Sequence, residues 1–367
     1  YFIKWVNRLT KEWENTSMTK VRQNHGLLID RRPELKGLRF VQIDEFYPID
    51  PLQHNSFHHY VQNYYLKDFG LDAQRALLIN CREIPTDASK PFEEVFPNNS
   101  VDLSLRYRDP QSKFEESQKK TIHLIDQWCT EYEDKIQEMG GIGFFLGGIG
   151  PDGHIAFNVR GSDHHSTTRL MKTNFETQAA AAVDLGGIEV SKHRLVITIG
   201  LETITKNRNS VAIIIAAGEG KAEIVRGSIE TESDIEYPAS ALHKLLGARF
   251  YLTEGAASGL TDVRMHRLNN EQWSHKKTEH AIISLCSKLG KFGSRLKIED
   301  LRDDAQTALI PQFDDETVPS VIQSLKAKIE KGLQSRENEI FFHTGPHHDD
   351  ITLGYLPFIA HLVRSPR

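Results

Sequence analysis

Apolar positions along the chain follow two periods, and the changes between them predict the elements of the fold. Short runs of β-branched and aromatic residues favour buried strands at 38–43, 142–146, 194–199, 211–216 and 249–252. Between these runs, apolar residues recur every three or four positions near 1–14, 57–64 and 122–139, which predicts helices there. A short polar helix is expected at 202–206, and further helices are expected at 222–229 and 238–246. Strands that alternate with helices imply a parallel sheet with helices on both faces, a three-layer α/β/α fold.

Three segments depart from this alternation. Residues 80–113 are polar and contain several prolines, which predicts a long excursion over the end of the sheet. After residue 260 the chain becomes more charged, and helical periods near 278–289 and 318–333 predict a helical linker. An apolar run at 339–343 predicts a strand that begins a second α/β domain. The expected domains are therefore 1–260, 261–337 and 338–367.

Charged chemistry begins where the strand at 142–146 ends. The strand runs into a glycine-rich turn, and Asp152 and His154 follow it. Ligands of open α/β sheets bind at the carboxyl ends of the strands, and an Asp and a His two residues apart can act as an acid–base pair. A glycine turn with a solvated Asp and a structural His explains the same pattern, and spacing alone does not decide between the two.

The segment Leu-Gly-Gly-Ile-Gly-Pro-Asp-Gly-His-Ile-Ala-Phe-Asn at 146–158 resembles the signature of the glucosamine-6-phosphate deaminases (isomerases). The match continues through Gly161-Ser162 and Thr168-Arg169, and an ordered series of matches covers about residues 1–260. That family converts glucosamine 6-phosphate and water to fructose 6-phosphate and ammonia. The resemblance implies a Rossmann-like deaminase fold and a deaminase (isomerase)-like hydrolase of amino-sugar catabolism that needs no cofactor.

The resemblance also implies roles by position. Asp152 and His154 would catalyse opening of the sugar ring, and His154 is suited to moving the proton. Gly148, Gly153 and Arg169 would bind the substrate.

A second catalytic group is expected from Asp44-Glu45-Phe46-Tyr47, which follows the strand at 38–43. The segment resembles the Asp-Glu-Tyr motif of the deaminases, with Phe46 before or in place of the aromatic residue. By that resemblance Asp44 is the base that removes the proton from C2 of the sugar. On its own, an Asp-Glu pair that begins a solvated loop explains the segment as well.

A phosphate site is expected where the strand at 211–216 gives way to Ala-Gly-Glu-Gly-Lys and a helix. Free amides, the helix dipole and an ammonium group all favour an anion there, although many strand-to-helix loops contain Gly and Lys. The deaminases have a phosphate-binding lysine at this point, so the resemblance assigns that role to Lys221.

The chain departs from the family pattern at one site residue and at its start. The deaminases have a glutamate directly after Asn158, whereas this chain has Val159, so ring opening could be slow or the substrate altered, and Asp163 is a candidate replacement. The strand and Gly/Ser/Thr-rich loop that open the family are not found before Tyr1, so we expect a fragment. A non-catalytic sugar-phosphate sensor and a 6-phosphogluconolactonase-like hydrolase remain as alternative functions.

The end of the chain carries a different motif. Gly-Pro-His-His-Asp-Asp at 345–350 resembles the His-Pro-Asp-Asp motif of the PIG-L-type N-acetylglucosamine deacetylases, with His348 in place of Pro. The resemblance implies that His347 and Asp350 bind zinc in the complete C-terminal domain and that Asp349 is its base. A catalytic zinc normally has three protein ligands, and a polar loop of a truncated domain explains the same residues.

Composition restricts the partners. Lys and Arg number 45 against 50 Asp and Glu, a net charge of −5, so no basic excess indicates nucleic acid. No apolar run is long enough to span a membrane. Three widely separated cysteines without metal-ligand spacing favour reduced thiols in the cytoplasm. We expect a small-molecule sugar phosphate as the ligand, and a homo-oligomer is compatible with these features.

Overall fold

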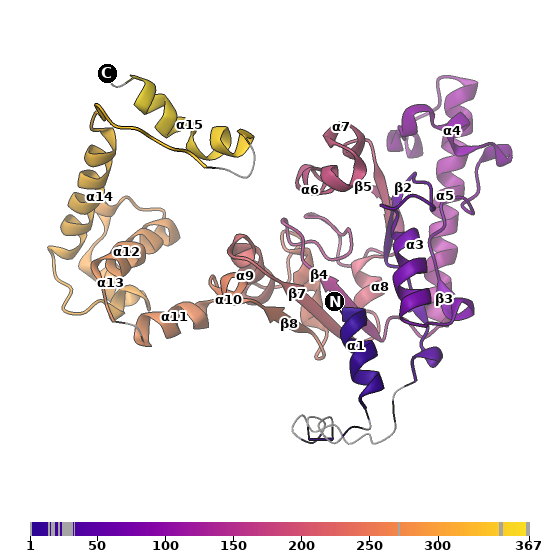
Figure 1. The fold of residues 1–367 in the computed structure, drawn as a ribbon, viewed down its shortest axis with the longest axis horizontal. Coiled ribbons are helices and arrows are strands. Elements are labelled where there is room, and N and C mark those ends of the chain that lie inside the picture. Colours follow the sequence, from indigo (N-terminus) through magenta and orange to yellow (C-terminus); the bar gives the residue numbers. More distant parts are fainter. Residues whose placement is uncertain are drawn as a thin grey trace. The chain divides into compact units, whose positions relative to one another are not determined.

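The chain divides into two units, one ending at Leu260 and the other beginning at Thr261 (Figure 1). Among the residues that the structure describes, all the strands lie in the first unit, and the second unit is helical. The computed structural model describes residues 2–13, 15, 19, 20, 23, 32, 34–270, 272–344 and 348–364.

Parallel strands form two of the three sheets of the first unit. β4 (Phe144–Gly148), β7 (Val211–Ala216) and β8 (Arg249–Leu252) lie side by side in that order. β1 (Phe40–Val41) pairs with β3 (Ala76–Leu77). The prediction of an α/β fold with parallel strands is confirmed, and β7 and β8 occupy the predicted positions.

The third sheet is antiparallel and contains a strand that the sequence pattern missed. β6 (Leu195–Thr198) lies between β2 (Asp44–Tyr47) and β5 (Arg169–Lys172). Charged residues occupy both ends of β5, and four residues are too few to show a period. Asp44, which was expected after a strand, is the first residue of β2 and lies opposite Thr198. Its backbone is therefore fixed by the sheet.

Helices pack on these sheets through buried apolar stripes. The longest, α5 (Lys113–Glu138), begins at the N-cap Ser112. Its buried Tyr132 hydroxyl lies 2.7 Å from the Gln42 carbonyl and 3.0 Å from the Leu77 carbonyl, which ties the helix to the β1–β3 pair. The other α-helices in the described part of this unit are α1 (Phe2–Lys11), α3 (Phe57–Tyr60), α4 (Phe92–Val95), α6 (Phe175–Leu185), α7 (Ile188–Ser191), α8 (Leu201–Thr205), α9 (Ala222–Glu230) and α10 (Glu254–Ala257).

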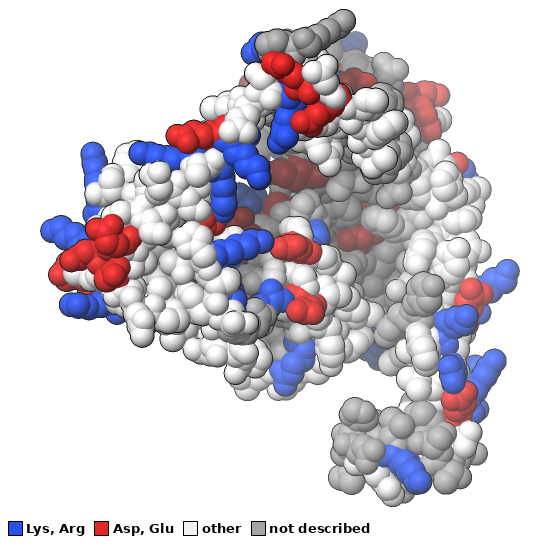
Figure 2. Space-filling model, turned by 60° about the vertical axis from the view of Figure 1, so that its left-hand side comes forward, with Lys and Arg blue, Asp and Glu red and all other residues white. Residues whose placement is uncertain are grey.

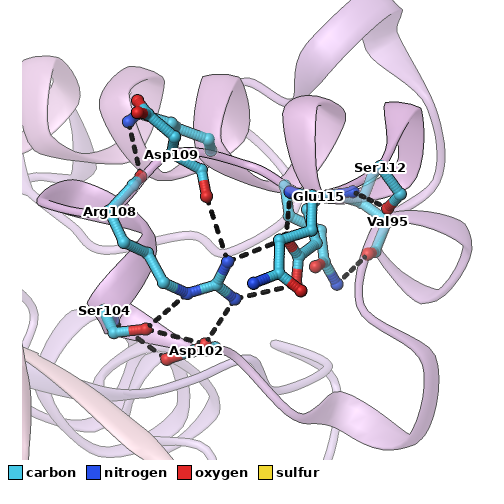
Figure 3. A network of polar contacts seen from close by, with 10 residues as sticks. Val95, Asp102, Ser104, Arg108, Asp109, Ser112 and Glu115 are labelled. Carbon is cyan, nitrogen blue, oxygen red and sulfur yellow. Dashed lines mark hydrogen bonds and ion pairs between the residues drawn. The ribbon is translucent and has the colours of Figure 1, made fainter.

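The polar excursion before α5 is held in place by a network around Arg108 (Figure 3). Its guanidinium contacts the Glu115 carboxylate at 2.7 Å and the Asp102 carboxylate at 3.0 Å, and it donates to the Ser104 hydroxyl. The hydrogen bonds from Arg108 lower the pKa of Glu115 to about 2. Because Glu115 lies in the first turn of α5, the network attaches the excursion to that helix.

The second unit is built from α-helices around its own apolar core. Side chains of Ile282, Leu285, Leu301 and Val321 lie at the centre of this core. The helices are α11 (Thr261–Asn270), α12 (His275–Leu289), α13 (Ile298–Asp303), α14 (Thr317–Leu333) and α15 (His348–Arg364). The predicted helices near 278–289 and 318–333 are present as α12 and α14.

The strand predicted at 339–343 is wrong. These residues have no regular secondary structure, and Ile340 and Phe342 are 85% and 90% exposed. A single extended segment needs neighbouring strands to be stable, and the described part of this unit contains none. His347 lies outside the described residues, whereas Asp349 and Asp350 belong to α15.

Charged side chains of both signs are interspersed over the face drawn in Figure 2. Among the described residues, no helix has the length and apolar character needed to cross a bilayer. The described residues also contain no group of three or more His, Cys, Asp or Glu side chains that could hold a metal ion.

Candidate active site

The loop after β4 turns back so that Gly150 lies against the ring of His154. The Gly150 amide donates to the His154 carbonyl at 2.9 Å, and the Gly153 amide donates to the Gly150 carbonyl at 3.2 Å. Gly153 has φ of 86°, in the left-handed region that favours glycine. A Cβ on Gly150 would lie 2.0 Å from Cε1 of His154. Glycine at 150 is therefore required for the imidazole to occupy its place.

Asp152 and His154, which were predicted to act together, are in contact. Asp152 Oδ1 lies 2.5 Å from His154 Nδ1, and the Asp152 side chain is fully buried. Its other oxygen accepts from the Arg160 amide at 2.9 Å and from Asn174 Nδ2 at 2.6 Å. Burial opposes the charged form, but the hydrogen bonds outweigh it and hold the pKa of Asp152 well below its usual value. An ionised carboxylate therefore orients the imidazole.

The second ring nitrogen of His154 is available to a ligand. No described residue makes a hydrogen bond to Nε2, and the ring stacks on Phe157 with centroids 5.9 Å apart. Because ionised Asp152 can only accept, the neutral imidazole carries its proton on Nδ1 and presents Nε2 as an acceptor. Such a nitrogen can take a proton from a bound molecule and later return it.

Helix α6 contributes two contacts to this pair that sequence reasoning missed. Asn174 caps the helix by accepting from the Thr177 amide at 3.0 Å, and its side-chain amide donates to Asp152. The Thr177 hydroxyl lies 3.4 Å from His154 Nδ1. Asn is one of the residues preferred at the N-cap, so the start of α6 could have been found. The pattern does not indicate that the cap would also bind Asp152.

The two carboxylates of β2 have different environments. Glu45 is fully buried, and its oxygens accept from the Ser56 hydroxyl at 2.8 Å and from the amides of Phe57 and His58 at 3.1 and 2.7 Å. These groups lie at the start of α3, so Glu45 holds that helix against β2. Its pKa is raised by burial, against the opposing effect of the hydrogen bonds. Both carboxylate oxygens of Glu45 are thus occupied by hydrogen bonds within the protein.

Asp44, unlike Glu45, has a carboxyl group that can react with a substrate. No described residue donates a hydrogen bond to its carboxylate. Burial, with the neighbouring Glu45 charge, raises the pKa of Asp44 to about 8. A carboxyl group with a pKa near neutrality and no partner suits a base that exchanges protons with a substrate.

A chain of contacts connects Asp44 with the histidine. Asp44 lies opposite Thr198 in the β2–β6 pairing, and the Thr198 hydroxyl accepts from the Phe157 amide at 3.1 Å. The Phe157 ring in turn stacks on His154. The sheet therefore brings residues separated by more than 100 positions into one region.

Lys221 lies beside the same loop. Its ammonium group donates to the Ile149 carbonyl at 3.0 Å, and its charge interacts with Asp152. Burial lowers the pKa of Lys221, and the Asp152 charge opposes that change. The predicted order of strand, glycine turn and helix is present, with Gly218 at φ of 92° before α9. The lysine thus stands directly before the first residue of a helix.

Arg169, which was predicted to bind substrate, makes hydrogen bonds to other residues of the protein. Its guanidinium donates to the Asn158 side-chain oxygen at 3.0 Å and to the Ser162 hydroxyl at 3.3 Å. Arg169 also lies opposite Thr198, on the other side from Asp44. It therefore holds the loop that carries His154 against the antiparallel sheet. Gly148 is exposed at the end of β4, where that loop begins.

Asp163 does not replace the glutamate that was expected at Val159. Val159 is 8% exposed, and the Asp163 carboxylate accepts from the His165 amide at 2.8 Å and interacts with Arg169. None of the described contacts of His154 involves Asp163. The support for the histidine comes from Asp152.

Comparison with known proteins shows homology over part of the chain. A glucosamine-6-phosphate deaminase of Caenorhabditis elegans is 37% identical over 142 residues, which are 37% of this chain and 52% of the relative. A glucosamine-6-phosphate isomerase of Candida albicans is 33% identical over 136 residues, 37% of this chain and 54% of the relative. The chain thus spans about half the length of these curated relatives.

A solved structure, described as that of a monomeric glucosamine-6-phosphate deaminase, aligns with 66% of this chain and 81% of its own at 22% identity and a TM-score of 0.46. No family model matches the chain. The deacetylase resemblance of residues 338–367 stays a prediction.

Replacing Gly150 by alanine should displace His154 from Asp152, because the new Cβ needs space that the imidazole occupies. In nitrogen NMR spectra of the folded variant, we expect the His154 ring to lose the signal of an Nδ1 proton bonded to a carboxylate. Gly148→Ala is the matched control, because its Cβ would meet no atom closer than the Ile215 carbonyl at 3.8 Å. An unchanged His154 spectrum in Gly150→Ala would contradict the steric argument.

Asp44 should lower the stability of the folded protein as the pH rises from about 4 to about 8. Its ordinary pKa is 3.8 and its folded pKa is about 8, so over this window the folded state keeps a proton that the unfolded state releases. The stabilisation present at low pH is lost progressively, by on the order of a few kcal/mol.

Asp44→Asn remains neutral, so urea unfolding should show a difference in stability between variant and parent that grows in the variant's favour from about pH 5 to about pH 8. A difference that stays constant across this window would mean that Asp44 ionises with an ordinary pKa.

Proposed function

We propose that the first unit catalyses the isomerisation and deamination of glucosamine 6-phosphate, which yields fructose 6-phosphate and ammonia. The proposal rests above all on His154, whose Nδ1 is held by an ionised carboxylate while Nε2 has no partner among the described residues. The partial relatives, a glucosamine-6-phosphate deaminase and a glucosamine-6-phosphate isomerase, support this choice of reaction. Water is consumed only after an isomerisation, so the chemistry is that of an isomerase followed by hydrolysis of an imine.

Ring opening is the step that the Asp152–His154 pair would serve. The C1 hydroxyl must lose a proton and the ring oxygen must gain one. Nε2 of His154 can accept the first proton, and the resulting imidazolium can deliver a proton to the ring oxygen. The Asp152 carboxylate stabilises the imidazolium, because it is already ionised and in contact with Nδ1.

Transfer of a proton from C2 to C1 is the step assigned to Asp44. The ionised carboxylate removes the C2 proton of the open-chain aldehyde while the C1 oxygen takes up a proton from the ammonium group of the substrate, which gives an enolamine. The protonated Asp44 then returns its proton to C1, and a protonated imine is left at C2. Water then adds to the imine and ammonia leaves. A base without a partner is ready for this role, and its raised pKa strengthens it as a proton acceptor once ionised.

Lys221 would hold the phosphate of the substrate. Lys221 is the N-cap residue of α9, and its ammonium group and the amides at a helix start both favour an anion. Arg169 would act by holding the loop, and Gly148 and Gly153 by allowing the substrate close to the backbone. Anchoring the phosphate fixes C1 and C2 relative to His154 and Asp44.

Ammonia release from glucosamine 6-phosphate by the full chain tests the proposal. We expect Asp44→Asn to lower kcat by about 10²- to 10⁴-fold while substrate binding changes little, because a base acts in the transition state. The parent's kcat/KM should rise with pH up to about 8, since Asp44 acts only when ionised.

Asp163→Asn is the matched control, because it removes a nearby carboxylate that does not contact His154. Its kcat should stay within about twofold of the parent. If the chain binds the sugar phosphate but releases no ammonia, it is a non-catalytic sensor and the proposed enzymatic function is wrong. Full turnover in Asp44→Asn would remove Asp44 from the mechanism.

For the C-terminal segment we propose that His347 and Asp350 are two ligands of a deacetylase-type zinc site with Asp349 as its base. Only the sequence motif supports this proposal. Two protein ligands hold zinc weakly, so we expect the 367-residue chain to contain much less than one zinc per molecule by mass spectrometry of metals, with or without His347→Ala. One zinc per chain that survives His347→Ala would contradict the assignment.

A further inference from the structure

A cavity lies in the first unit, at the other end of the strands that carry Asp44 and Thr198. It has a volume of about 570 Å³, which falls in the range of small-molecule sites. Its wall includes Tyr47 from the end of β2 and Arg194 from the residue before β6, together with segments 48–53 and 81–93. Tyr47 lies opposite Leu195 at one end of the β2–β6 pair, whereas Asp44 lies opposite Thr198 at the other.

Two buried donor groups in the wall of this cavity have no partner. The Tyr47 side chain is 1% exposed, and its hydroxyl makes no hydrogen bond to any described residue. The Nε of Arg194 is also buried and without a partner in the described part of the chain. The guanidinium does donate to the Pro48 carbonyl through Nη1. Buried donors are nearly always paired, and among the unpaired donors of the described chain these two belong to residues that line this cavity.

The charge of Arg194 is not compensated inside the cavity. No described carboxylate forms an ion pair with it, and burial lowers its pKa. The neighbouring Cys81 thiol does not supply a negative charge, because burial raises its pKa. The five other charged residues of the wall are all exposed, namely Asp50, Arg82, Glu83, Lys90 and Glu93, and Asp50 is paired with Arg82 at 2.9 Å. The interior is therefore positive, although the rim is mixed.

We propose that this cavity is a second binding site, distinct from the candidate active site, for a small molecule that carries an oxyanion group. The oxyanion, a phosphate or a carboxylate, accepts from Arg194 and from the Tyr47 hydroxyl. A guanidinium suits both groups, because its planar fork matches two oxygens at once. The cavity volume leaves room for a body about the size of a sugar or a small organic acid.

The probes are inorganic phosphate and succinate, which separate the two kinds of oxyanion. Each is titrated by calorimetry at constant ionic strength into the full chain carrying Lys221→Ala, which weakens phosphate binding at the candidate active site. Arg194→Gln in the same background removes the charge of the cavity. Arg208→Gln is the matched control, because it removes one exposed positive charge elsewhere in the same unit.

At least one probe should bind, and Arg194→Gln should weaken its binding by about tenfold or more, whereas Arg208→Gln should leave it within about twofold. Whichever probe binds identifies the oxyanion. If Arg194→Gln does not fold, Tyr47→Phe takes its place, and it should weaken binding by about threefold or more. Absence of binding by both probes, or equal binding by the cavity variant and Arg208→Gln, would overturn the proposal.

Discussion

The ionised carboxylate of Asp152 is the group on which the candidate active site depends. One oxygen contacts His154, and the other accepts from the Arg160 amide and from Asn174, which also caps α6. Its charge interacts with Lys221 as well. A buried charge is stable only when its hydrogen bonds are satisfied, so the loop, α6 and the start of α9 must keep their positions together for Asp152 to remain ionised. The orientation of the histidine follows from that arrangement.

The adjacent carboxylates of strand β2 have different roles, one structural and one chemical. Successive residues of a strand point to opposite faces, and Asp44 and Glu45 accordingly meet different surroundings. Glu45 is bound by the groups at the start of α3, whereas Asp44 has no donor among the described residues. The engaged carboxylate keeps the strand and helix together, and its negative charge helps to raise the pKa of its neighbour. Glu45, which has a structural role, thus helps to set the pKa of Asp44, the proposed base.

Each of the two sites contains a polar group that has no partner among the described residues. The Arg108 network shows the usual outcome, in which a charged side chain is surrounded by partners and serves to attach one segment to another. The carboxylate of Asp44 and the Nε of Arg194, at opposite ends of the β2–β6 pair, have no hydrogen-bond partner among the described residues. Desolvation without compensation destabilises the fold, and a ligand bound at each site would supply the missing interaction.

Sequence by itself determined the features that depend on neighbouring residues. The β-branched runs of β7 and β8, the glycine turn before α9 and the Asp-x-His spacing are all local, so the alternation of strands and helices and the contact of Asp152 with His154 could be predicted. Tertiary structure alone decided the antiparallel pairing of β2, β6 and β5, the link from Asn174 to Asp152 and the raised pKa of Asp44. Each of these depends on residues far apart in the chain or on burial, which local patterns do not record. The irregular segment at 339–343 shows the same limit, because an apolar run becomes a strand only where another strand lies beside it.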